Sequence, residues 1–81
     1  MPPHHISITL GGAVYRVPKF NLGQHERMVD ARAFEVLRIG LERAEPKVED
    51  PNTLELTFPE IKAAVAAIME FSGYKSPDPN V

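Results

Sequence analysis

The sequence predicts a small α+β domain in which an N-terminal β-hairpin packs with two α-helices. Apolar and polar residues alternate on both sides of Gly11-Gly12, and two later segments repeat apolar residues at helical spacing. The chain has 81 residues, of which 43% are apolar, which is enough for one core. A length of this order accommodates one domain at most, so we expect a single domain over 1–81.

The predicted hairpin covers about residues 6–18. Alternation from Ile6 to Leu10 is typical of a half-buried strand, and Gly11-Gly12 can form a two-residue turn because both positions accept positive φ. A tight turn gives one register, which pairs apolar residues on one side: Leu10 with Ala13, Ile8 with Tyr15, and Ile6 with Val17. Pro18 ends the second strand because it has no N–H to donate.

One long helix is predicted from about Asn21 to Ala44, with Asn21 as its N-cap and Gln24 at the third position after it. On a helical wheel, one broad face is apolar and is expected to be buried: Val29, Ala33, Phe34, Val36, Leu37, Leu41 and Ala44. The opposite face is charged, but Met28 and Ile39 fall within it.

After a loop, Thr53–Thr57 alternates again and could form a short third strand. Thr57 and Glu60 then make a capping box for a second helix, which ends near Gly73. The face of this helix that we expect to be buried consists of Ile61, Ala64, Val65, Ile68, Met69 and Phe71. Residues 1–5 and 75–81 lack such patterns, and we expect flexible ends there.

Several classes of protein are not expected. Without cysteine, the chain cannot form a disulfide scaffold, a zinc–thiolate site or an iron–sulfur cluster. The longest uncharged apolar stretch, Ala63 to Met69, is far below the roughly 20 residues of a membrane span, and the N-terminus does not resemble a secretory signal. We therefore expect a cytoplasmic protein with no membrane partner.

No set of residues indicates catalysis. His4 and His5 should point to opposite faces of a strand, and His25 is distant in sequence, so no metal site is expected. Glu26 and Asp30 share a helix face, but nothing else converges on them. We accordingly expect no catalytic residues, no cofactor and no metal, and the chain is not expected to be an enzyme.

Charge also disfavours nucleic acid as a partner. Nine basic and eleven acidic residues leave a formal charge of −2, and the arginines of the first helix alternate with glutamates. A small regulatory nucleic-acid-binding protein of phage origin remains the alternative function.

Candidate partner-binding residues lie on the helices. Met28 and Ile39 stand among charged residues, and Ala63, Ala66 and Ala67 form a small-sided face that another helix could approach closely. Several exposed apolar residues on a small domain favour a protein partner or self-association into a homo-oligomer.

The run Ile6-Ser7-Ile8-Thr9-Leu10-Gly11-Gly12-Ala13-Val14-Tyr15-Arg16-Val17-Pro18, the later Leu22-Gly23-Gln24 and the closing Phe71-Ser72-Gly73-Tyr74 resemble the tail assembly chaperones and related small tail proteins of tailed phages and prophages. The resemblance implies a non-enzymatic protein in the cytoplasm of a bacterial host. It also implies a structural partner, the tape-measure or tail-tube protein, bound through apolar surface. It supplies no catalytic residues.

Overall fold

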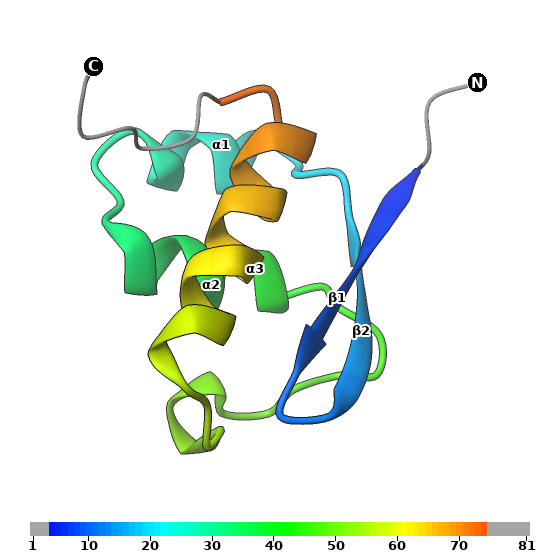
Figure 1. Cartoon of the computed structure of the whole chain (residues 1–81). Coiled ribbons are helices and arrows are strands. Elements are labelled where there is room, and N and C mark those ends of the chain that lie inside the picture. Colours follow the sequence, from blue (N-terminus) through cyan, green and yellow to red (C-terminus); the bar gives the residue numbers. More distant parts are fainter. Residues whose placement is uncertain (1–3, 75–81) are drawn as a thin grey trace.

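A two-stranded antiparallel hairpin lies beside three α-helices in the computed structural model, which describes residues 4–74 (Figure 1). The elements in order are β1 His5–Leu10, β2 Ala13–Pro18, α1 Leu22–Met28, α2 Ala33–Leu41, the 3-10 turn η1 Pro51–Thr53 and α3 Phe58–Phe71. The predicted α+β class is confirmed. Residues 1–3 and 75–81 of the expected flexible ends lie outside the described residues, whereas His5 is the first residue of β1.

The predicted hairpin register is confirmed. Ile6 pairs with Val17, Ile8 with Tyr15 and Leu10 with Ala13. The turn residues Gly11 and Gly12 have φ of +57° and +84°, values that other residues adopt only at a cost. The register directs one side of the hairpin toward the helices, so the turn determines which strand residues enter the core.

The single long helix predicted over 21–44 is wrong. The chain leaves the helix after Met28 and re-enters one at Ala33, so that α1 and α2 are separate elements. No side chain caps α2, because Arg32 at its N-cap position makes no side-chain hydrogen bond. The break is therefore explained by burial of apolar residues, because it lets both Met28 and Ile39 reach the core. A local sequence pattern does not reveal this burial.

Polar contacts between the two short helices are consistent with this break. The amide Nε2 of Gln24, a buried polar residue, donates to the Ile39 carbonyl at 2.9 Å. Arg27 forms ion pairs with Glu35 and with Glu42. In one continuous helix, Arg27 and Glu42 would be separated by about 22 Å along the axis, so this pair requires the turn.

The third strand expected over Thr53–Thr57 is also wrong. The segment begins inside η1 and continues without regular structure, and its Leu54 and Leu56 side chains are half-buried. A different segment pairs with the outer edge of β2: Arg16 of this strand forms an isolated antiparallel bridge with Glu45. The carbonyl of Glu55 instead lies beside Gly11 at the hairpin turn.

The predicted ends of the last helix are confirmed, with one difference. Thr57 accepts a hydrogen bond from the Glu60 N–H, and Gly73 ends the helix with φ of +90°. The Glu60 side chain, however, is not confined to the cap of its own helix. It accepts hydrogen bonds from the Thr57 hydroxyl and from the Gly11 N–H, and so ties α3 to the hairpin.

The core lies between the hairpin and the helices. Its members are all less than one-tenth exposed: Ile8, Leu10, Val17, Phe20, Met28, Val36, Leu37, Ile39, Leu41, Ala44, Ala64, Val65 and Ile68. Helices α2 and α3 approach closely at Gly40, where a Cβ would come within 2.6 Å of Ile68 Cδ1. The buried face predicted for the last helix is confirmed at Ala64, Val65 and Ile68, whereas Ile61, Met69 and Phe71 are only half-buried.

Candidate protein-binding surface

Two of the predicted partner-binding residues are wrong. Met28 is 5% exposed and Ile39 is 0% exposed, so neither can contact a partner. The reason is the break between α1 and α2, which changes the phase of the helical wheel. The same change exposes three residues that were expected in the core, Val29, Ala33 and Phe34.

The three alanines of α3 lie at or near the surface. Ala63 is exposed, and Ala66 and Ala67 are half-buried. Ala63 and Ala67 line an open hollow of about 250 Å³, which β1 borders with Ser7 and Thr9. The structure thus places the alanine face next to the hairpin.

The exposed aromatic residues gather where α2 meets α3. Phe34 and Phe58 are 53% and 59% exposed, and their rings meet edge to face with centroids 6.4 Å apart. Beside Phe34 is an open groove of about 280 Å³. We call the pair and this groove the Phe34–Phe58 groove; its lining residues are Phe34, Leu37, Arg38, Pro51, Asn52, Leu54, Leu56 and Ile61.

Helix starts and a local turn position this groove. Phe34 and Phe58 both lie in the first turn of their helices, and the cap at Thr57 fixes the start of α3. Pro51 and Asn52 of η1 also line the groove, and Asp50 accepts hydrogen bonds there from the Asn52 N–H at 3.0 Å and the Thr53 hydroxyl at 2.7 Å. These bonds direct Leu54 and Leu56 toward the groove.

Two cationic side chains lie near the groove, and one of them is paired with a glutamate. Arg38 Nε donates to Asn52 Oδ1 at 2.8 Å and Arg38 Nη1 to Glu35 Oε2 at 3.2 Å, which holds the guanidinium along the edge. Lys62 Nζ lies 6.0 Å from the centroid of the Phe58 ring, and within residues 4–74 it forms no ion pair. An apolar segment with an acidic neighbour would match this arrangement.

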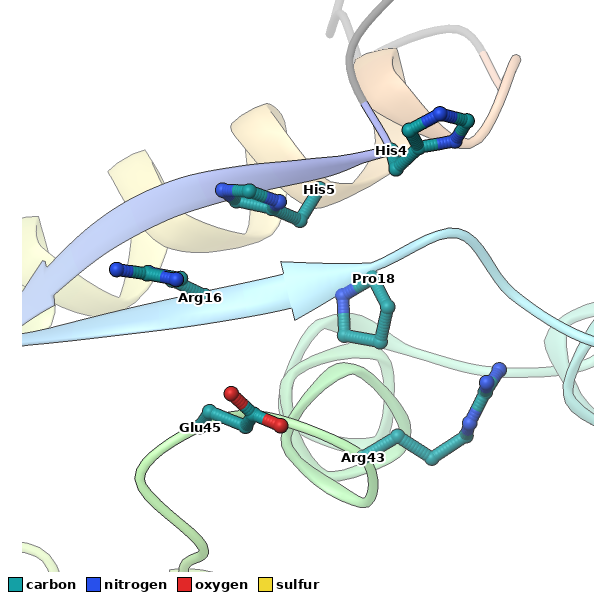
Figure 2. Close-up of a pocket in the computed structure, with 6 residues that line it drawn as sticks. All are labelled: His4, His5, Arg16, Pro18, Arg43 and Glu45. Carbon is teal, nitrogen blue, oxygen red and sulfur yellow. The ribbon is translucent and has the colours of Figure 1, made fainter.

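A second pocket lies near the outer edge of β2 (Figure 2) and is lined by His4, His5, Arg16, Pro18, Arg43 and Glu45. Its cationic side chains do not converge, because Arg43 extends away from Glu45 while Arg16 lies at the other side of the view. Arg43 Nη1 is also engaged by the Lys19 carbonyl at 3.0 Å and by Gln24 Oε1 at 3.4 Å. These hydrogen bonds connect Arg43 to the segment that joins β2 to α1 and to α1 itself.

The remaining histidine, His25, belongs to an aromatic cluster. Its Nδ1 is 2.7 Å from the Tyr74 hydroxyl, and its ring contacts Phe20 edge to face. The hydrogen bond joins α1 to the end of α3. Throughout residues 4–74, no group of three or more histidine, cysteine or acidic side chains could hold a metal ion. In the same part of the chain, every helix is too short or too polar to cross a membrane.

Sequence reasoning missed the Phe34–Phe58 groove because Phe34 was counted in the core and Phe58 was considered only as part of a cap. One signal could have found it. Met28 and Ile39, two large apolar residues on the charged face of the predicted helix, indicate that the helical phase changes between them. If the helical wheel is drawn only as far as Met28, Phe34 no longer shares a face with the buried residues and is not predicted to be in the core.

Comparisons with protein-family models, curated proteins and solved structures give no match to this chain.

Proposed function

We propose that this chain is a non-enzymatic protein-binding domain and that the Phe34–Phe58 groove holds an apolar helical segment of its partner. The observation that carries the proposal is the aromatic pair itself. Both rings are more than half exposed beside a groove that apolar side chains line together with Arg38 and Asn52. Exposed apolar clusters of this kind on small domains are typical of interaction sites. Aromatic side chains dominate the energetics of interfaces because each buries a large area.

The size of the groove favours side chains over a small-molecule ligand. Its volume of about 280 Å³ is slightly below that of ligand pockets, which usually measure about 300–1,000 Å³. Anchors spaced at i, i+3 and i+4 on an amphipathic helix fit such a groove. An acidic residue beside these anchors would meet Lys62 next to the Phe58 ring.

The resemblance to tail assembly chaperones supports a specific form of this proposal. The partner is then the tape-measure or tail-tube protein of a phage or prophage, bound in the cytoplasm of the bacterial host. A chaperone for a structural protein needs an apolar surface, and the exposed Phe34 and Phe58 rings could supply one.

Co-expression with a tagged tape-measure or tail-tube protein tests the proposal. We expect Phe34→Ala and Phe58→Ala each to reduce co-purification at least about tenfold, the loss of roughly one well-packed anchor. Leu22→Ala is the matched control, because Leu22 is 85% exposed and lies outside the groove. Equal capture of all variants, or no capture of the wild type by either protein, would contradict the proposal.

Nucleic-acid binding is the second candidate, and one observation favours it. Helices α1 and α2 are joined by the short turn 29–32, a connection of the length found in helix-turn-helix motifs. Against it, Arg27 and Arg38 are both paired with glutamates. Fluorescence polarisation with random duplex DNA at low and high salt distinguishes the candidates, since phosphate binding would weaken steeply with salt.

A further inference from the structure

We propose that the free edge of β1 pairs antiparallel with the same edge of a second copy of this chain, which joins two hairpins into one sheet. This edge lies where β1 meets α3, and its residues are not those of the Phe34–Phe58 groove. The proposal does not depend on the proposed function. The argument rests on the backbone groups of β1, on the state of the two hairpin edges and on the hollow beside Ala63.

The hydrogen bonds of Arg16 show how the strand groups are directed. The Arg16 N–H donates to the Glu45 carbonyl at 2.7 Å, and the Glu45 N–H donates to the Arg16 carbonyl at 2.9 Å. These bonds lie on the side of β2 that faces away from β1. Because antiparallel pairs alternate, Ser7, the partner of Arg16, must direct its own N–H and C=O away from β2. Two residues later, Thr9 does the same.

These outward groups of β1 have no protein partner among residues 4–74. The N–H and C=O groups of Ser7 and Thr9 point away from β2, so they do not bond within the hairpin. Among residues 4–74 they form no other backbone hydrogen bond. Unpaired N–H and C=O groups along a strand edge are a template for another strand, because an extended chain satisfies them all at once.

The two edges of the hairpin differ in their protection. The edge of β2 is bridged by Glu45 and ends in Pro18, which has no N–H. From Ile6 to Leu10, β1 has neither a proline nor a charged side chain. Natural proteins usually block exposed edges with such residues, so an open, uncharged edge indicates that another strand pairs with it.

Space for an added strand is present beside this edge. The hollow of about 250 Å³ between β1 and α3 has Ser7 and Thr9 on one side and Ala63 and Ala67 on the other. Alanine side chains are too short to fill the region next to β1, so a strand could lie about 4.8 Å from β1 and cover this part of α3.

Two copies of β1 can pair with each other in an antiparallel register centred on Ser7. When Ser7 faces the Ser7 of a second copy, His5 faces Thr9 on the solvent side and Ile6 faces Ile8 on the covered side. This register pairs the outward backbone groups of both strands and places no like charges opposite each other. It is also symmetric, as the interface of a two-fold dimer must be.

Sedimentation over a range of concentrations tests the pairing. We expect the wild type to form a dimer of twice its 9.0 kDa mass. Ser7→Glu places two carboxylates opposite each other at the two-fold axis, and we expect it to weaken the dimer at least about tenfold. Within one hairpin, the new carboxylate faces Arg16, so the monomer should keep its fold and its melting temperature.

Val14→Glu is the matched control. It adds the same charge to the solvent side of β2, away from the β1 edge, and should leave the dimer unchanged. Hydrogen exchange gives the second readout: the Ser7 and Thr9 amides should gain protection as concentration rises. A wild type that remains monomeric at millimolar concentration would overturn the proposal. So would a dimer that Ser7→Glu leaves unchanged, or one that Phe34→Ala abolishes, since that variant tests the groove.

Discussion

The β1–β2 hairpin and the α1–α2 pair both reverse the chain, but different interactions hold them. In the hairpin, two glycines with positive φ and a backbone ladder determine the reversal. Between α1 and α2, the turn has no capping side chain, and contacts distant in sequence hold it: the Gln24 amide on the Ile39 carbonyl, and the ion pair between Arg27 and Glu42. The backbone specifies the first reversal, and the core specifies the second.

This difference decides which apolar residues remain outside. The hairpin turn keeps the alternation of β1 in register. Ile8, Leu10 and Val17 are therefore buried and Ile6 and Tyr15 half-buried, whereas Ala13 beside the turn is exposed. The α1–α2 turn changes the helical phase, which brings Met28 and Ile39 into the core and leaves Phe34 at the surface. The candidate binding surface is therefore a consequence of the reversal that tertiary contacts determine.

The largest expected effect contrasts Ile39 with Phe34. Ile39→Ala should lower the free energy of unfolding by about 2–5 kcal/mol, because it leaves a cavity among fully buried neighbours. Phe34→Ala should lower it by no more than about 0.5–1 kcal/mol, because the ring is more than half exposed. Urea denaturation measures both. The reverse order would indicate one continuous helix and would contradict the α1–α2 turn.

The second prediction concerns the hairpin. Replacing Gly11 and Gly12 together with valine should cost about 1–3 kcal/mol, because branched residues resist positive φ. Gly23→Ala is the control: its Cβ would meet only Asn21 Oδ1, at 3.6 Å, and alanine favours the helix. A thermal melt of the double variant that overlays the wild type would exclude a backbone-determined turn.

The smallest effect depends on pH. The hydrogen bond from the Gly11 N–H lowers the pKa of Glu60 below the ordinary carboxyl value of 4.5, with a further contribution from the Thr57 hydroxyl. Because the pKa is lower in the folded state, unfolding takes up a proton. This contribution to stability is complete above the unfolded-state pKa and is lost as pH falls through the folded-state pKa.

Thermal melts between neutral pH and pH 3 check this dependence. The melting temperature of Glu60→Gln should fall less steeply in acid than that of the wild type, whereas Glu49→Gln, a change at an exposed loop residue, should follow the wild type. Parallel curves for all three proteins would show that Glu60 does not connect α3 to the hairpin.

Local signals were sufficient for part of this fold. Gly11-Gly12 predicted the strand register, Asn21 and Thr57 predicted two helix starts, and Gly73 predicted a helix end, because each acts on adjacent backbone groups. The break after Met28 and the irregular path of Leu54–Thr57 could not be predicted in this way. Both depend on contacts between segments far apart in sequence.

The candidate binding residues also fall into a part that local signals predict and a part that depends on tertiary contacts. The alanine face was correctly placed near the surface at Ala63, since the capped helix α3 kept the expected phase. The Phe34–Phe58 groove requires α2 and η1 to meet α3, and no spacing within one segment indicates that meeting.

One distance tests the α1–α2 turn most directly. Spin labels at positions 27 and 42 of the full chain report the separation of the two helices in solution. The structure predicts a distance well below the roughly 22 Å that separates these positions in a continuous helix, because Arg27 and Glu42 form an ion pair. A distance at or above that value would contradict the turn, the burial of Met28 and Ile39, and with them the exposed position of Phe34.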